Sequence, residues 1–263
     1  MAYIDRDGVN IHYDVQGPAR GLPVLLSHGH AAAMPTWAPQ VAALRERFRV
    51  ITWDLRGHGR SAAPDDPARY TVEHTVADMA AILDACGIAR AVIGGHSLGG
   101  VMSFQFQLRH PERVLAMAIL NSGPGFRSDS ARDAWNISCE RTAASLTRKG
   151  LAALAKSSEV RAAWHRDVRG LIHAARGIMT HRDARMIDNL GNIAVPVLVL
   201  VGDRDREFLG AADYMARKIP DVHKFVVENA GHAANLDQPE TVNRLLCDFL
   251  ERVAETTGEA APV

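Results

Sequence analysis

The stretch that decides the fold runs from Ala91 to Phe106, AVIGGHSLGGVMSFQF, and its four glycines crowd around one serine, Ser97. An apolar run typical of a buried strand precedes the serine, and a helical pattern follows it. Gly95, Ser97 and Gly99 match G-x-S-x-G, a pattern that places a serine on a sharp strand-to-helix turn. At such a turn the strand and the helix nearly touch. We therefore expect both glycines to be steric requirements.

A glycine-rich phosphate-binding loop is the alternative reading of this stretch. Such loops carry G-x-x-x-x-G-K-[ST] or G-x-G-x-x-G, and neither pattern occurs here. The helix that starts just after Ser97 also directs its positive end at the serine hydroxyl, which favours negative charge there. The stretch therefore predicts a nucleophilic serine.

Other apolar runs along the chain are typical of strands that are buried on both faces. They occupy Pro23–Ser27, 50–54, 91–94, Val114–Leu120, 195–202 and 224–227, after a period-2 strand pattern at 9–15. Helical patterns lie between and after these runs, at 37–48, 72–86, 97–109, 209–219 and 240–253. Strands that alternate with helices predict an α/β fold with a doubly wound, mostly parallel sheet.

One region interrupts this alternation after the sixth strand. Between Pro124 and Pro196 the chain has no proline, and apolar residues recur at helical spacing. A single crossover between two strands needs far fewer residues, so ordinary crossover helices are the weaker reading. We predict a helical cap at 125–195, inserted in a core formed by 1–124 and 196–253. Residues 254–263 lack periodicity and are expected to form a disordered tail.

The bulk composition excludes several classes of protein. The 263 residues are 47% hydrophobic, and 30 basic residues balance 30 acidic ones, so no charge excess marks a nucleic-acid or membrane partner. No apolar run approaches the roughly 20 residues of a membrane span, and the first residues do not resemble a signal peptide. The three cysteines have no CxxC spacing, which fits free thiols in a reducing compartment. We expect a soluble cytoplasmic protein, a monomer or homodimer, whose partner is a small-molecule substrate.

Several motifs together resemble the α/β-hydrolase family. They are SHGH at 27–30, DLRGHGRS at 54–61, GGHSLGG at 94–100, VGDRD at 201–205 and AGH at 230–232. The resemblance extends over essentially the whole chain. It implies a serine hydrolase whose catalytic residues follow the order serine, acid, histidine, and which requires neither a metal nor an organic cofactor.

Twelve histidines compete for the role of general base. His232 follows the last strand in a glycine-containing loop, NAGHAAN, and the family fold brings that loop over Ser97. His96 is next to the serine, but on a strained turn we expect its side chain to point elsewhere. His28 belongs to the loop that binds the oxyanion, and His110 resembles a helix end. His232 is therefore the predicted base.

Two aspartates compete for the acid that orients this histidine. Asp203 and Asp205 both follow a buried strand. The family usually places the acid three residues after the glycine, which is Asp205 here, and Asp203 then becomes a polar loop residue. Many relatives carry a proline shortly after the acid, but this chain has Phe208 and Leu209. The course of this loop is therefore open.

The oxyanion of a tetrahedral intermediate needs two backbone N–H donors. The resemblance implies Leu98, which follows the nucleophile, and His30, in the loop after Pro23–Ser27. A zinc site at His28 and His30 is the rival reading, but the loop offers no third ligand. The DLRGHGRS motif is expected to brace the loops beneath the pocket.

The substrate is less well defined by the sequence. The cap has a surplus of basic residues, which would suit an anionic substrate, but solvated helix faces explain it equally well and are the favoured reading. Trp135, Trp164 and Met179, together with Ile137, are candidate pocket residues. A small or medium carboxylic ester is the default substrate, which makes the chain a predicted carboxylesterase.

Other reactions and one non-enzymatic role stay open. The same residues support carbon–carbon bond hydrolysis of a meta-cleavage product, lactone opening and peracid formation. Epoxide hydrolysis and dehalogenation are disfavoured, because those relatives need an aspartate where Ser97 stands. A small-molecule receptor on the same fold is the non-enzymatic alternative.

Overall fold

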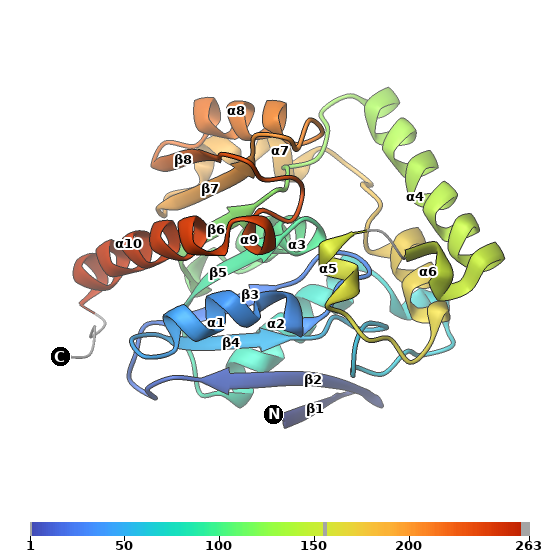
Figure 1. Cartoon of the computed structure of the whole chain (residues 1–263), viewed down its shortest axis with the longest axis horizontal. Coiled ribbons are helices and arrows are strands. Elements are labelled where there is room, and N and C mark those ends of the chain that lie inside the picture. Colours follow the sequence, from blue (N-terminus) through green and yellow to red (C-terminus); the bar gives the residue numbers. More distant parts are fainter. Residues whose placement is uncertain (1, 155–156, 259–263) are drawn as a thin grey trace.

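The computed structural model of the protein describes residues 2–154 and 157–258. It has one sheet of eight strands in the order β1-β2-β4-β3-β5-β6-β7-β8 (Figure 1). The strands are β1 (Ala2–Arg6), β2 (Val9–Gln16), β3 (Pro23–Ser27), β4 (Arg49–Trp53), β5 (Ala91–His96), β6 (Val114–Leu120), β7 (Val197–Gly202) and β8 (Val222–Val227). Strand β2 pairs antiparallel with β1 and β4, and every other pairing is parallel. The predicted fold class is confirmed.

Successive side chains of the central strands point to opposite faces of the sheet, and they pack into two hydrophobic cores, one on each face. In β6, for example, Ala118 belongs to one core and Ile119 to the other. Strands β3, β5, β6 and β7 are buried along their entire lengths. This burial on both faces is the reason that they are nearly continuous apolar runs in the sequence.

Helices cover both faces of the sheet. Helices α1 (Ala38–Leu44) and α10 (Pro239–Thr257) contribute to the core on one face. Helices α2 (Val72–Ala85), α3 (Leu98–Arg109) and α8 (Leu209–Lys218) contribute to the core on the other face. The short helix α9 (Ala234–Asp237) connects the loop after β8 to α10. The described chain also contains five short 3₁₀ helices, at Met34–Trp37, Pro67–Arg69, Pro111–Arg113, Gly150–Leu154 and Leu190–Asn192.

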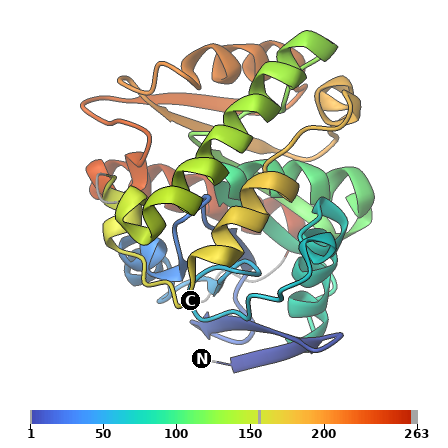
Figure 2. The same cartoon turned by 90° about the vertical axis from the view of Figure 1, so that its right-hand side faces the viewer.

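The region between β6 and β7 is helical. It contains α4 (Asp129–Lys149), α5 (Ser158–Arg161), α6 (Val168–Gly177) and α7 (Arg185–Asp188). Helices α4 and α6 pack side by side (Figure 2). Their facing residues form a small apolar cluster that also includes Ala31 of the core: Ala143, Leu146, Leu171, Ile172 and Ala175. The division into core and cap remains our prediction, and residues 155–156 of the cap lie outside the described residues.

The predicted start of the tail at residue 254 is wrong. Helix α10 continues to Thr257, and Val253 and Ala254 are only 3% and 2% exposed. The helix ends because Gly258 adopts a left-handed conformation, with φ of 66°. Packing of Val253 and Ala254 against the core therefore extends the helix beyond the last apolar period that is clear in the sequence. Residues 259–263 lie outside the described part of the chain.

None of the helices in the described ranges is both long and apolar enough to cross a membrane.

Candidate active site

Ser97 occupies a sharp corner between β5 and α3. Its backbone has φ of 53° and ψ of −117°, a conformation that residues with a side chain rarely adopt. A Cβ atom on Gly95 would overlap the backbone of Gly99, and one on Gly99 would overlap the carbonyl of Ser27. The glycines therefore allow the strand and the helix to approach, and the corner directs the serine hydroxyl away from the sheet.

Ser97, His232 and Asp205 form one hydrogen-bonded chain. The Nε2 atom of His232 lies 2.9 Å from Ser97 Oγ, and Nδ1 lies 2.9 Å from Asp205 Oδ2. A carboxylate accepts hydrogen bonds only, so Nδ1 carries the imidazole proton and Nε2 accepts from the serine hydroxyl. The structure thus brings together the three residues that were predicted as nucleophile, base and acid.

The neighbouring carboxylate, Asp203, has a different position. Its side chain is partly exposed, and its Oδ1 accepts a hydrogen bond of 3.0 Å from the backbone N–H of Ala230. Asp203 therefore supports the loop that carries His232, and only Asp205 contacts the imidazole.

Electrostatics suit the proton transfer that this arrangement requires. Burial tends to raise the pKa of Asp205, but hydrogen bonds from His232 and Asn121 outweigh it and lower that pKa. Burial tends to lower the pKa of His232, but the hydrogen bond and charge of Asp205 raise it above the ordinary value. Asp205 is therefore ionised near neutral pH and stabilises the protonated form of His232.

The sequence analysis missed two residues that follow β6. Asn121 Nδ2 donates to Asp205 Oδ2 at 2.8 Å and to the carbonyl of Gly231 at 3.0 Å. Ser122 Oγ donates to the carbonyl of Ser97 at 2.7 Å. A usable signal existed, because polar residues that directly follow a buried parallel strand lie at the edge of the sheet where sites form.

His96 lies beside His232 and contacts the loop that carries it. Its Nε2 donates a 2.7 Å hydrogen bond to the backbone carbonyl of His232, and the two rings lie 4.9 Å apart. Burial, reinforced by the neighbouring His232, lowers the pKa of His96 to about 3, so this ring is neutral. The loop after β8 folds back over the corner, and His96 consequently supports the base.

The two predicted oxyanion donors border the same cavity as Ser97. Leu98 is the first residue of α3, and the first N–H groups of a helix have no partner within the helix. The His30 side chain donates from Nε2 to the carbonyl of Leu171 in α6 at 2.9 Å. His28 Nε2 accepts from the Leu55 N–H at 3.0 Å. In 2–154 and 157–258, no group of His, Cys, Asp and Glu is arranged to hold a metal ion.

A cavity of about 300 Å³ opens beside Ser97. Trp135 and Met179 line it, as predicted. The prediction for Trp164 is wrong, because this side chain is 60% exposed and borders other surface hollows. Ile137 is also exposed, at 53%. Trp135 and Ile137 lie in α4, but Trp164 lies in the irregular segment between α5 and α6, so the helical spacing seen in the sequence does not hold there.

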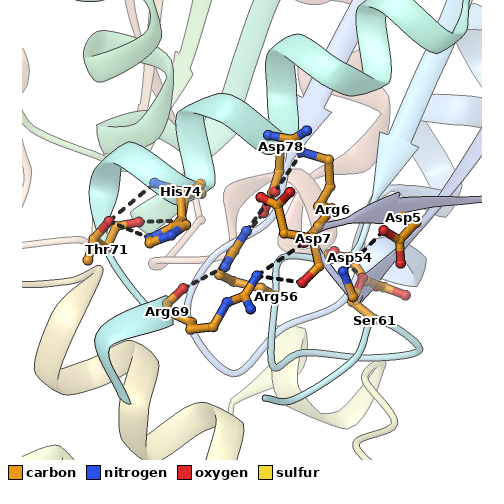
Figure 3. A network of polar contacts seen from close by, with 12 residues as sticks. Asp5, Arg6, Asp7, Asp54, Arg56, Ser61, Arg69, Thr71, His74 and Asp78 are labelled. Carbon is orange, nitrogen blue, oxygen red and sulfur yellow. Dashed lines mark hydrogen bonds and ion pairs between the residues drawn. The ribbon is translucent and has the colours of Figure 1, made fainter. Parts of the chain in front are cut away.

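Residues of the DLRGHGRS motif belong to a polar network (Figure 3). Arg56 makes two hydrogen bonds to Asp78, of 2.8 and 2.7 Å, and donates to the carbonyl of Arg69. Asp54 accepts from the His12 ring at 2.9 Å and from the Met34 N–H at 2.7 Å. These contacts join the loop after β4 to β2, α2 and the loop after β3.

Fold and site together define a class of protein. The chain belongs to the alpha/beta hydrolase fold family, whose model matches residues 23–159. It is 32% identical to a putative carbamate hydrolase RutD of Variovorax paradoxus, over 93% of this chain and 97% of the relative. It is 27% identical to 3-oxoadipate enol-lactonase 1 of Acinetobacter baylyi, over 95% and 96% of the two chains.

A solved structure shows the same similarity in three dimensions. A thermophilic esterase from Thermogutta terrifontis superimposes with a TM-score of 0.83 at 26% identity, covering 96% of this chain and 99% of the esterase. The protein is thus an alpha/beta hydrolase with relatives of several specificities.

Proposed function

We propose that the protein is a serine hydrolase that cleaves a small or medium carboxylic ester through an acyl-enzyme intermediate. The observation that carries this proposal is the chain of two 2.9 Å hydrogen bonds from Ser97 Oγ through His232 to Asp205. A serine hydroxyl becomes an effective nucleophile when a base removes its proton and a third group orients that base.

The first half of the reaction forms the acyl-enzyme. Ser97 Oγ attacks the ester carbonyl while His232 Nε2 takes its proton, and Asp205 stabilises the resulting imidazolium. The backbone N–H groups of Leu98 and His30 bind the oxyanion. The tetrahedral intermediate then expels the alcohol, which takes the proton from His232.

The second half of the reaction releases the acid. Water attacks the acyl carbonyl, and His232 accepts a proton from that water. Collapse of the second intermediate returns the proton to Ser97 Oγ and frees the carboxylic acid. Apart from the attacking water, these steps use side chains and backbone groups of the chain itself.

Replacement of the nucleophile tests this proposal. We expect Ser97→Ala to lower kcat for p-nitrophenyl esters by at least about four decades, because the residue starts the covalent route. Labelling by a fluorophosphonate probe should disappear as well. Ser130→Ala, a change of an exposed serine on α4, is the matched control and should leave both readouts intact. Near wild-type turnover in Ser97→Ala would refute the assignment.

Lactone opening is the second candidate, and the similarity to an enol-lactonase favours it. The bond that breaks is also an ester bond, but the alcohol stays tethered to the acyl group. A series of small lactones assayed beside open-chain esters separates the two. Lactone kcat/KM values well above those of the esters would assign the protein to lactones. Labelling of Ser97 without turnover of either series would instead favour a receptor.

A further inference from the structure

Three aromatic side chains form the wall of the cavity on the side of the cap. The rings of Phe126, Trp135 and His181 lie 5.7 to 5.9 Å from one another, centroid to centroid. All three line the cavity that opens beside Ser97. Rings at this spacing form a stable apolar surface against which a flat apolar group packs well.

Helix α4 fixes this wall in place. Trp135 Nε1 donates to the carbonyl of Met179 at 2.8 Å, which satisfies the indole N–H. The amide side chain of Asn136 bonds both the carbonyl and the N–H of His181, at 3.0 and 2.9 Å. The backbone of His181 is thus held from two sides, and its ring packs edge-to-face against Phe126.

The His181 ring has hydrogen-bonding capacity that the described chain does not use. The residue is 7% exposed, and among residues 2–154 and 157–258 no hydrogen bond joins either ring nitrogen to another protein group. By contrast, the ring of His30 in the same cavity already bonds Leu171. His181 lines the cavity, so an imidazole nitrogen without a protein partner is available there to a polar group of a ligand.

The His181 ring is also uncharged. Burial, reinforced by the charge of Arg132, lowers the pKa of His181 to about 4. A neutral imidazole offers one N–H donor and one lone pair, and the proton can occupy either nitrogen. It therefore suits an uncharged oxygen such as that of an ether, hydroxyl or carbonyl.

The surrounding charges do not favour an anionic group. Glu207 lines the cavity and would repel one. Arginines of the cap bond to carboxylates instead: Arg132 bonds Asp129, and Arg176 makes two hydrogen bonds to Glu140. The basic surplus of the cap is thus consistent with solvated helix faces.

We propose that His181 is a specificity-determining residue that hydrogen-bonds an uncharged oxygen in a substrate whose flat apolar part packs on Phe126 and Trp135. The inference rests on the proposed hydrolytic function and defines its substrate class, a neutral ester with an aromatic group and one additional oxygen. His181 acts on the remote part of the substrate and takes no part in bond cleavage.

Matched pairs of esters test this proposal. The pairs are 2-phenoxyethyl acetate with 3-phenylpropyl acetate, and 2-(benzyloxy)ethyl acetate with 4-phenylbutyl acetate. Within each pair one linker CH₂ is replaced by an oxygen. The measured quantity is the ratio of kcat/KM for the ether to kcat/KM for its alkyl partner. We expect this ratio, in at least one pair, to be about 3- to 10-fold higher in the wild type than in His181→Phe, because one neutral hydrogen bond is lost.

Additional variants separate the hydrogen bond from packing. His181→Leu also lacks the hydrogen bond and should behave like His181→Phe, so the test survives if one of them does not fold. His181→Gln retains a donor and an acceptor and should keep part of the preference. Ratios that are equal in the wild type and in both apolar variants would overturn the proposal.

A binding measurement distinguishes failure of this inference from failure of the proposed function. In Ser97→Ala the same esters are ligands and not substrates, so calorimetry gives their dissociation constants directly. If the wild type hydrolyses no ester, a 3- to 10-fold loss of ether preference on adding His181→Phe still supports the inference. Ester turnover without any such preference, or no binding of either pair, would refute it.

Discussion

Two aspartates that are two residues apart differ in their contacts with the base. Asp205 is 5% exposed in its side chain and lies 2.9 Å from the imidazole of His232. Asp203 lies at the surface and bonds a backbone N–H. The difference arises from the tight turn after β7, in which the N–H of Asp205 bonds the carbonyl of Gly202 at 3.1 Å.

This difference predicts unequal effects of the same substitution. Asp205→Asn should lower kcat about 10³- to 10⁴-fold, because an amide no longer favours the protonated base or the required tautomer. Asp203→Asn should cost less than about tenfold, with a loss of stability near 1 kcal/mol from one weakened hydrogen bond. Steady-state kinetics of the two variants on one ester provide the check. A larger loss of kcat in Asp203→Asn than in Asp205→Asn would identify Asp203 as the acid.

At the residue scale the sequence predicted the three residues of the hydrogen-bonded chain but not the residues that hold them in place. Ser97, Asp205 and His232 each follow a recognisable strand, so chain order and motif suffice to find them. His96 and Asn121 act through backbone carbonyls of the loop after β8, and no sequence pattern specifies the course of such a loop. Trp164 was assigned wrongly, because the helical spacing that includes it does not correspond to a helix. The residue lies in the irregular segment between α5 and α6.

At the scale of elements, the junction of β5 and α3 constrains the site most strongly. Gly99→Ala should destabilise the protein by more than about 3 kcal/mol, because its Cβ would overlap the Ser27 carbonyl in a packed strand. Gly210→Ala is the matched control, since no atom lies within 4 Å of its Cβ position in α8. Alanine there should stabilise by about 0.4 to 1 kcal/mol. Urea unfolding measures both, and a Gly99→Ala protein of normal stability would contradict this account of the corner.

The elements of the core were predictable because their patterns arise from burial. Residues 91–94 and Val114–Leu120 are apolar throughout, and the structure covers both faces of these strands. Helix ends were predicted less well. Helix α10 passes residue 253 because Ala254 still packs against the core, and a short hydrophobic period does not show such a contact.

At the scale of the whole molecule, two histidines join the helical region to the core. His30 donates to the Leu171 carbonyl at 2.9 Å. His165 donates from Nε2 to the Ala31 carbonyl at 2.8 Å and accepts from the Gly59 N–H at 3.2 Å. The sequence predicted the helices over the site but could not predict these contacts, which join residues more than a hundred positions apart.

The burial of these two rings predicts that the protein loses stability in mild acid. Burial lowers the pKa of His30 to about 4 and also lowers that of His165. Between about pH 6.5 and pH 4 the unfolded chain therefore binds more protons at these residues. The stability of the folded protein is therefore highest with respect to these residues above about pH 6.5, where both states leave them uncharged. This part of the free energy of unfolding is lost as the pH falls toward the folded-state pKa values. His30 alone should account for about 2 kcal/mol between pH 7 and pH 5. The pKa of His232 is raised, so the folded protein binds a proton there more readily than the unfolded chain does. The titration of His232 therefore stabilises the folded protein as the pH falls.

Urea unfolding at pH 7 and pH 5 measures this loss. His30→Gln removes the titrating ring and keeps a donor for the Leu171 carbonyl, so the difference between the two pH values should shrink by about 2 kcal/mol. Equal stabilities of the wild type at both pH values would contradict the expected effect of burying these two rings.

The separation of the nucleophile and the base along the chain affects biosynthesis. Ser97 and His232 are 135 positions apart, and His232 enters its place only after β8 has joined the sheet. A ribosome therefore completes the corner around the serine long before it translates the imidazole. The nascent polypeptide therefore lacks the Ser97–His232 pair until the segment that carries His232 has left the exit tunnel.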